Sequence, residues 1–447
     1  MLVRLNPFKK YIFLAPFEYT IGNAAEHIYY GLLAARLTNK KLVLIVRQPG
    51  FVRRISKGIV QARLTNREIF KVRSEGMIIP SDYFFCRVFG KILDLVFIPM
   101  YFFDKVMRRL FKKEFNSFFA IPTFGHNTVY NPGRELRFSW AAVEKYNWEK
   151  TLAENIPVSI NTKSNLAAEE ILVQMGLPKD SWYVTIHVRE RGFYNESEAA
   201  GAYRCANIHN YIETIKYITS LGVWVVRLGD SSMTPLPDMD CVIDYPHTPF
   251  KSDLMDLYLI KNCSLYIGMD SGTWGVACLF QKSSLLTNST AWCLTFPSKH
   301  GDLAIIKHFY SKSRGRFLSV RECLEEPPTM NYHFLDSAPD HDKSDYIIVE
   351  NTSYEIKSAV EEKLDLGENY QYSELQNYFI EKRKKQIKQW LVEDPYLAGN
   401  TMQSFRFSTM YFYKGTLSQK FLEDNWEFGE YLEKLTERFK KNNLLHL

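Results

Sequence analysis

The sequence lacks the phosphate-binding and nucleophile motifs of the commonest α/β enzymes. It contains no G-x-x-x-x-G-K-[ST] loop, no G-x-G-x-x-G after an apolar strand and no G-x-S-x-G turn. These absences argue against P-loop nucleotide hydrolases, ordinary dinucleotide dehydrogenases and α/β-hydrolases. A phosphate site in this chain would therefore have to be built in another way.

Metal-binding cysteine pairs and long apolar runs are also missing. The seven cysteines are odd in number and no two have C-x-x-C spacing, so neither a zinc site nor a disulfide framework is indicated. The N-terminal residues lack the apolar run and small-residue cleavage site of a secretory signal peptide. No stretch reaches the roughly 18 apolar residues of a membrane-spanning helix. We therefore expect a cytoplasmic protein.

The composition is that of a globular protein with a mild excess of positive charge. With 447 residues, 46% of them hydrophobic, the chain can bury sizeable cores in two or three domains. Its formal net charge of +6 suits an anionic small molecule or a membrane surface and falls short of a nucleic-acid-binding surface. We expect no nucleic-acid partner.

Residues 83–115 form an aromatic and basic segment. It is interrupted by Pro99 and ends in the cationic stretch "RRLFKK" (108–113). Aromatic rings beside cations suit a helical insertion that lies on the anionic inner face of the plasma membrane. A core helix with a solvated basic end explains the pattern equally well, and the sequence leaves both interpretations open.

Apolar strands and amphipathic helices alternate along most of the chain. The first βαβ unit comprises strands over 10–16 and 42–50 around a helix over 24–41, and residues 118–133 read as a strand and loop returning to the same edge. A second series has strands over 183–188, 223–230, 241–246, 264–268 and 283–288, and helices over 207–222, 252–263 and 273–282. This alternation predicts an α/β fold with two Rossmann-like domains. We expect them at 1–170 and 171–330, followed by a helical extension over 331–447 that packs back on the N-terminal domain.

The stretch "LYIGMDSGTWGVACLF" (265–280) carries the strongest ligand signal. An apolar strand ends at Gly268, and the loop Asp270-Ser271-Gly272 leads into a helix. Backbone N–H groups at a helix start, together with the positive end of its dipole, attract anions. The loop therefore predicts a phosphate site. The alternative is an N-capped helix whose polar residues satisfy only its own first N–H groups.

A second charged strand end, "VTIHVRER" (184–191), is expected at the same sheet edge. The ends of parallel strands meet where ligands bind in open α/β sheets. Arg189 and Arg191 can bind phosphate oxygens through their planar, permanently charged guanidinium groups. His187 is interpreted as a hydrogen-bond partner of the ligand, with a satisfied core histidine as the alternative.

Weaker signals complete the set of candidate residues. "VVRLGD" (225–230) offers Asp230 to a ribose hydroxyl and Arg227 as a further cation. "NAAEHIYYG" places Glu26 and His27 at the start of the first helix, where either could take a proton from a hydroxyl across an interdomain cleft. Favourable placement of a carboxylate near a helix N-terminus is the alternative for Glu26. The "PDMDC" stretch (237–241) follows "TPLP" rather than an apolar strand, so we interpret it as a polar loop and predict no metal site.

Five ordered stretches resemble a known family. "IHVRE", "NIHNYIETIKYITSLGVWVVRLGD", "VIDYP", "SDLMDLYLIKNCSLYIGMDSG" and "RGRFLSVRECLEE" are similar to bacterial glycosyltransferases encoded among surface-polysaccharide (O-antigen and capsule) genes. "HVRER" also resembles the H-x-R strand end of fucosyltransferases with the GT-B fold. The resemblance covers roughly residues 175–330.

The resemblance implies a GT-B-like protein with two facing Rossmann-like domains. The second domain would hold a nucleotide-sugar donor, the first a glycan or lipid-linked acceptor, and neither a metal nor another cofactor would be needed. Carried over residue by residue, it places Arg189 at the diphosphate and Ser271 with Gly272 at the phosphate-binding helix start. With Glu26 and His27 as further catalytic candidates, we expect a glycosyltransferase. A nucleotide-sugar epimerase or hydrolase and a non-catalytic membrane-surface scaffold remain as alternatives.

Overall fold

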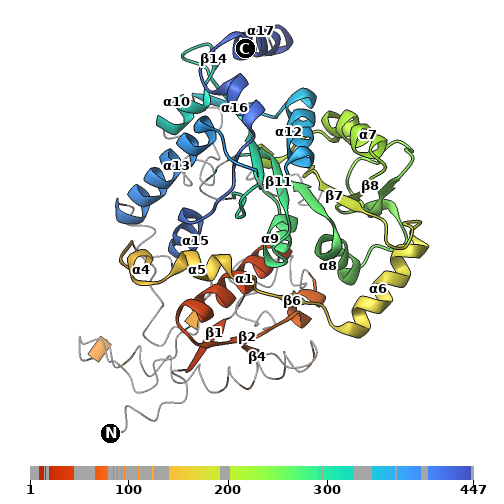
Figure 1. The fold of residues 1–447 in the computed structure, drawn as a ribbon, viewed down its shortest axis with the longest axis vertical. Coiled ribbons are helices and arrows are strands. Elements are labelled where there is room, and N and C mark those ends of the chain that lie inside the picture. The colour runs from red at the N-terminus through yellow and green to blue at the C-terminus, as the bar shows by residue number, and fades with distance from the viewer. Residues whose placement is uncertain are drawn as a thin grey trace.

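Two parallel β-sheets, one above the other along the long axis of the molecule, form the framework of the computed structural model (Figure 1). The structure describes residues 10–14, 16, 20–44, 66–78, 84, 88, 92, 95, 106, 109–110, 123–124, 140–191, 202–290, 292, 295–325, 345–367, 370–393 and 401–443. The predicted α/β class with two parallel sheets is confirmed.

The N-terminal sheet is small and has the strand order β4-β2-β1-β5. Its strands, which pair in parallel, are β1 (Tyr11–Leu14), β2 (Lys41–Leu44), β4 (Met77–Ile78) and β5 (Thr123–Phe124). Because β5 pairs with β1, the chain returns to the first βαβ unit as predicted. Helix α1 (Ile21–Leu37) begins three residues before its predicted start at residue 24, so Gly22 lies within its first turn rather than in a loop.

The C-terminal sheet has seven parallel strands in the order β16-β12-β11-β10-β7-β8-β9. Their bounds are β7 (Tyr183–His187), β8 (Trp224–Leu228), β9 (Val242–Asp244), β10 (Leu265–Gly268), β11 (Ser284–Ser289), β12 (Leu303–Ile306) and β16 (Thr416–Leu417). The predicted helices correspond to α7 (Ile212–Ser220), α8 (Asp253–Asn262) and α9 (Gly272–Leu279). Strands β7, β10 and β11 are buried throughout, as expected for a parallel sheet covered on both faces.

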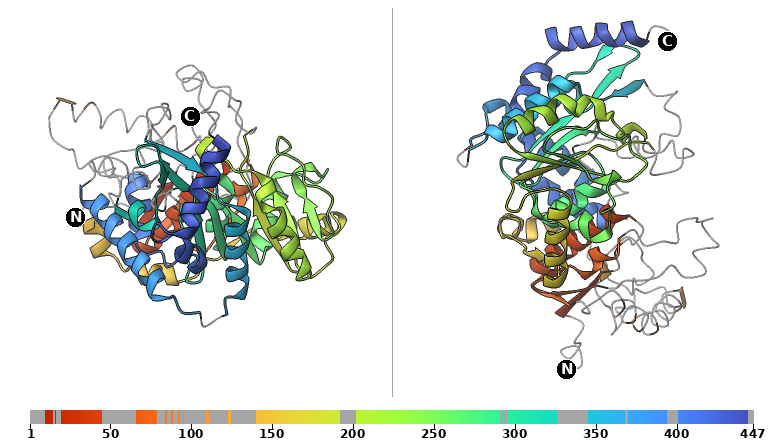
Figure 2. Two further views of the ribbon diagram at one scale, coloured as in Figure 1. Left: turned by 90° about the horizontal axis from the view of Figure 1, so that it is seen from above. Right: turned by 90° about the vertical axis from the view of Figure 1, so that its right-hand side faces the viewer.

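Shorter elements link and cover the two sheets. Between β2 and β4 are η3 (Glu68–Lys71) and β3 (Arg73–Ser74), and between β5 and β7 are α4 (Trp140–Lys145), α5 (Trp148–Ala153), β6 (Val158–Ser159) and α6 (Thr162–Gln174). Strands β3 and β6 form an antiparallel pair. Within the C-terminal unit are η5 (Ala202–Arg204), η6 (Ile208–Tyr211), η7 (Tyr245–His247) and α10 (Val320–Glu325). The N-terminal sheet lies at one end of the molecule and the last helix at the other (Figure 2).

The segment after residue 330, expected as a helical extension, contains strands as well as helices. The segment does contain α12 (Ser353–Asp365), α13 (Glu374–Glu393), α15 (Thr401–Tyr411), α16 (Gln419–Asn425) and α17 (Glu430–Asn443). It also adds β16 to the edge of the seven-stranded sheet, and β15 (Tyr346–Val349) to an antiparallel sheet with β13 (His308–Ser311) and β14 (Arg316–Phe317). Strand β16 has only two residues and gives no apolar pattern, whereas β15 has the apolar run YIIV and the sequence analysis missed it.

Part of this segment does contact the N-terminal unit. On α15, the ring of Phe405 lies 5.2 Å from that of Trp148 and 5.7 Å from that of Tyr30.

Most of the predicted insertion 83–115 lies outside the described residues. Its described positions 84, 88, 92, 95, 106, 109 and 110 are helical, and the apolar ones are exposed. None of the helices in the described ranges combines the length and apolarity needed to cross a bilayer.

The closest packing between the two sheet units is the contact of α1 with α9, which lie together at the centre of Figure 1. A Cβ atom added to Gly22 would lie 2.4 Å from the Cα atom of Gly272. One added to Gly275 would lie 2.5 Å from the carbonyl oxygen of Gly22. Only glycine allows the two helix backbones to approach so closely. This contact fixes the start of α1 beside the start of α9.

We expect Gly22→Ala to destabilise the protein, because the new methyl group meets backbone that cannot rotate away. Overpacking of this kind costs about 1–3 kcal/mol of unfolding free energy. Gly367→Ala is the matched control, because a Cβ there would meet nothing within 4 Å. Urea unfolding measures both variants. Equal stability of the two would contradict the close contact.

Candidate functional site

A cavity of about 420 Å³ lies where the predicted strand ends meet. Its walls come from the ends of β7, β8 and β10 and from the starts of three helices. Five of the predicted site residues line it, namely His187, Arg189, Asp230, Ser271 and Gly272. Residues of the "HVRER" strand end and of the "MDSG" loop therefore line the same cavity, as expected. The roles of these residues in binding stay predictions.

Three helices begin at this cavity. Thr20 and Ile21 come from the start of α1, Ser252 and Asp253 from that of α8, and Ser271, Gly272 and Thr273 from that of α9. The first N–H groups of a helix have no partner within the helix, and the helix dipole is positive at that end. Ser252 caps α8 by accepting from Met255 N–H, whereas the Ser271 side chain makes no such bond to α9. The start of α9 is thus better suited to an external anion.

His187 and Ser271 are joined across the two strand ends. The Oγ atom of Ser271 lies 3.1 Å from His187 Nδ1 and 3.0 Å from Thr273 Oγ1, which in turn lies 2.7 Å from the hydroxyl of Tyr266. Burial, followed by the charges of Arg189 and Arg227, lowers the pKa of His187 to about 3. His187 is therefore neutral at physiological pH. When Ser271 donates to Nδ1, the ring proton lies on Nε2, so the ring acts as an uncharged donor.

Four carboxylates also line the cavity, and each accepts hydrogen bonds from other protein groups. Glu190 accepts from Arg227 at 2.7 Å and from Thr234 N–H at 2.8 Å. Asp256 binds Lys251 and, at 3.0 Å, the hydroxyl of Tyr245. Asp253 accepts from the backbone N–H of Arg67 at 2.9 Å, and Asp230 from that of Ser232 at 2.9 Å. The cavity lining thus combines Arg189 and the start of α9 with hydrogen-bond acceptors, which suits a ligand with both phosphate and hydroxyl groups.

Lys251, Asp256 and Met233 line the cavity but were not among the predicted site residues. The Ser N-cap that marks the start of α8 was visible in the sequence as "KSDLMD". That α8 begins at the same cavity depends on sheet order, which the spacing of motifs does not give.

Arg227 does not line the cavity, contrary to prediction. Its side chain is fully buried and its guanidinium donates to Glu190 at 2.7 Å, to Asp244 at 3.1 Å and to the Thr234 carbonyl at 2.6 Å. A buried cation with two carboxylate partners is held in place and has little left to offer a ligand. Arg227 instead ties the end of β7 to the loop after β8.

Asp270, another predicted site residue, does not line the cavity either. It is buried and accepts from the N–H and hydroxyl groups of Thr290 at 2.8 and 2.6 Å and from Ser289 at 3.3 Å. Burial raises the pKa of this carboxyl, and the hydrogen bonds from Thr290 and the charge of Arg204 oppose the rise. The carboxylate therefore joins β10 to the end of β11. Arg191 is exposed and is not part of the cavity wall either.

The two catalytic candidates on α1 lie away from the cavity wall. Glu26 forms an ion pair with Arg406 of α15 at 2.9 Å, and burial raises the pKa of its carboxyl while Arg406 lowers it. His27 is buried, with 4% of its surface exposed. The prediction that either faces an open cleft is not met: Glu26 connects α1 to the returning C-terminal segment.

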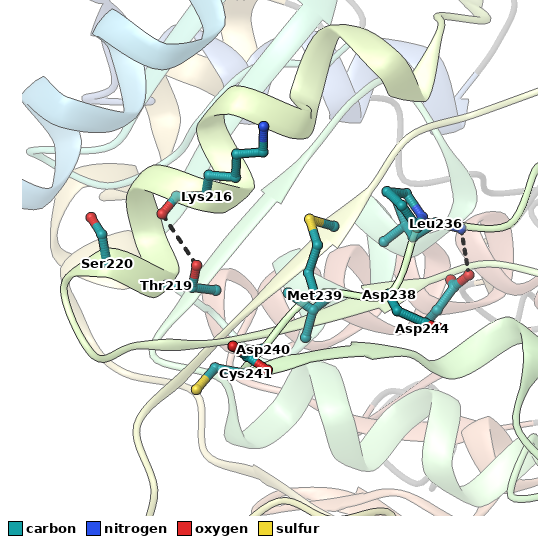
Figure 3. Close-up of a pocket in the computed structure, with 11 residues that line it drawn as sticks. Lys216, Thr219, Ser220, Leu236, Asp238, Met239, Asp240, Cys241 and Asp244 are labelled. Atoms are coloured by element: carbon teal, nitrogen blue, oxygen red, sulfur yellow. Dashed lines mark hydrogen bonds between the residues drawn. The ribbon is translucent and has the colours of Figure 1, made fainter.

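A second hollow of about 700 Å³ contains the Asp238-x-Asp240 pair (Figure 3). It lies between the end of α7, including Lys216 and Ser220, and the loop before β9. It shares no lining residue with the first cavity. The interpretation of 237–241 as a loop is correct, and in the described part of the chain no three His, Cys, Asp or Glu side chains gather as metal ligands.

Comparison with known proteins finds distant structural neighbours. No family model and no curated protein sequence matches the chain. A glycosyl transferase family 9 protein from Veillonella parvula is 12% identical, with a TM-score of 0.38 over 80% of this chain and 98% of that chain. Heptosyltransferase II from E. coli is 13% identical, with a TM-score of 0.29 over 66% and 90%. The fucosyltransferase NodZ from Bradyrhizobium is 14% identical, with a TM-score of 0.28 over 60% and 91%.

The lowered pKa of His187 predicts a pH dependence of stability. Below pH 6.5 the unfolded chain binds a proton at this residue that the folded chain excludes, so unfolding free energy is lost as the pH falls from 6.5 toward 3. The loss is about 1.4 kcal/mol per pH unit, or about 2 kcal/mol between pH 6.5 and 5. His187→Asn should remove this component from urea-unfolding curves recorded across that range, and His209→Asn, at an exposed histidine, is the control. An unaltered slope in His187→Asn would contradict the assignment.

Arg227→Met should destabilise the fold strongly, because it leaves Glu190 and Asp244 without their buried counter-charge. The expected loss is about 3–5 kcal/mol of unfolding free energy. The double variant Arg227→Met with Glu190→Gln should recover part of it. If denaturant unfolding shows a loss below about 1 kcal/mol for the single variant, Arg227 does not hold these elements together.

Proposed function

We propose that this protein is a glycosyltransferase that uses a nucleotide-sugar donor. The observation that carries the proposal is the meeting of Arg189, Ser271 and the start of α9 in one cavity of about 420 Å³. A diphosphate placed there would receive a guanidinium group, a hydroxyl group and free backbone N–H groups. The nucleoside would extend toward Asp230, whose carboxylate can accept from ribose hydroxyls.

In the proposed reaction an acceptor hydroxyl attacks the anomeric carbon of the sugar. The bond between that carbon and the diphosphate oxygen breaks, and its electron pair leaves with the nucleoside diphosphate. Arg189 and the positive end of α9 would stabilise the negative charge that develops there. The neutral His187 ring would donate a hydrogen bond from Nε2 to the ligand, and it need not be protonated first.

The finer parts of the proposal follow the expected resemblance. The acceptor would be a glycan or lipid-linked sugar of bacterial surface-polysaccharide synthesis, held on the side of the N-terminal unit. Because guanidinium and helix N–H groups take the place of a cation, transfer is expected without a divalent metal. The protein would work in the cytoplasm at the inner face of the plasma membrane, with the segment 83–115 as its contact.

Arg189→Ala should weaken binding of nucleoside diphosphates about tenfold or more, because charge-assisted hydrogen bonds to phosphate are lost. Thermal-shift screening against UDP, GDP, ADP and CMP identifies the nucleotide, and calorimetry then measures its affinity. Arg321→Ala removes an exposed arginine paired with Glu427 and is the control.

Sugar transfer from the matching nucleotide-sugar, followed with EDTA present, completes the test. Release of sugar without an acceptor would indicate a hydrolase instead. Failure of all four nucleotides to bind, or unchanged binding by the Arg189 variant, would contradict the proposal.

A further inference from the structure

A third cavity, of about 720 Å³, lies beside the last helix, α17, at the end of the molecule away from the N-terminal sheet (Figure 2). One wall is a single face of α17, whose lining residues recur every three or four positions from Tyr431 to Asn442. The opposite wall is the end of β15 and the turn that leads into α12. The volume falls within the range of about 300–1,000 Å³ that is typical of small-molecule sites.

Hydrogen bonds hold both walls of this cavity in place. The side chain of Asn351 donates to the Ile306 carbonyl at 2.7 Å and accepts from the Asn288 N–H at 2.7 Å, so the turn before α12 is tied to the ends of β11 and β12. The hydroxyl of Thr352, in the same turn, lies 3.1 Å from that of Tyr431 on α17. The cavity is therefore formed by the fold itself.

Aromatic rings make up much of the apolar lining. The side chain of Tyr354 is 47% exposed, and its ring lies 5.9 Å from that of Tyr431. Phe439 continues the lining along α17, and its ring lies 4.7 Å from that of Tyr310 on β13. A tyrosine presents a flat apolar face with one polar atom at its edge. A half-exposed ring on a cavity wall can therefore cover the apolar face of a ligand.

Polar side chains with unused hydrogen-bonding capacity also line the cavity. Among the described residues, the side chains of Asn210, Arg438 and Asn442 form no hydrogen bond or ion pair. Glu350 accepts from the Asn207 N–H at 2.7 Å through Oε2, and no described donor reaches its Oε1 atom. The lining thus offers two amides, a guanidinium group and a carboxylate oxygen, which together can donate and accept.

This combination matches the chemistry of a pyranose sugar. The C–H groups of such a ring form an apolar face, and each of its hydroxyl groups both donates and accepts. A simple anion would leave the carboxylate of Glu350 unused and close to a like charge. A hydrocarbon would cover these polar groups without pairing them, which is costly.

We propose that this cavity binds a sugar unit of a glycan, with the sugar ring against Tyr354. Its hydroxyl groups would bond to the side chains of Asn210, Glu350, Arg438 and Asn442. The proposal goes beyond the proposed function, because the cavity shares no lining residue with the one assigned to the donor. It gives the protein a second carbohydrate site, formed by the C-terminal unit alone.

The test is ligand-observed NMR on the full chain, with glucose, galactose, N-acetylglucosamine, rhamnose and glucuronate as probes. At least one probe should bind the wild type, and glucuronate distinguishes an acidic sugar from the neutral ones. Tyr354→Ala and Arg438→Gln should each raise its dissociation constant about fivefold or more, because a stacking face or charge-assisted hydrogen bonds are lost. Two matched controls should bind as the wild type does: Tyr378→Ala, at a tyrosine 45% exposed outside the cavity, and Lys441→Gln, in the last turn of α17.

The proposal is overturned if no probe binds the wild type, or if the Tyr354 and Arg438 variants bind as tightly as the wild type. A probe that is lost in Arg189→Ala but kept in Tyr354→Ala occupies the first cavity, and this result overturns the proposal as well. The nucleoside diphosphate found by screening should bind Tyr354→Ala unchanged. If no nucleotide binds while a sugar still requires Tyr354, the glycan site stands and the transferase function fails.

Discussion

The contact between the backbones of α1 and α9 determines the geometry of the candidate site. Because Gly22, Gly272 and Gly275 have no side chains, one helix from each sheet unit can begin at the same place. Without this approach Thr20 and Ile21 could not line a cavity formed mainly by the C-terminal sheet. The two units are thus joined at the site itself.

Several charged side chains near that contact form buried ion pairs. Charges that hold the fold are paired and buried, such as Arg227 between Glu190 and Asp244 and Glu26 with Arg406. Arg189 lines the cavity at which three helices begin. A low local dielectric strengthens electrostatic interactions of both kinds.

The sequence predicted the parts of the site that lie at the ends of apolar strands of one parallel sheet. Apolar strands ending in "HVRER" and "MDSG" had to finish at one edge, and Arg189 and Ser271 do line one cavity. It could not show that Glu190 and Asp244 reach Arg227, because those contacts depend on side-chain direction after the strands end. Likewise, the two-residue strand β16 joins the sheet through tertiary pairing with β12, and it carries no periodic signal of its own.

Hydrogen–deuterium exchange on the full chain, with and without the nucleoside diphosphate that binds, tests the central claim most directly. The first amides of a helix have no internal partner and exchange quickly unless a ligand accepts from them. The account predicts slower exchange at residues 271–273 and around Arg189 when the nucleotide is bound. Protection confined to the hollow at residues 236–241, or none at the start of α9, would contradict it.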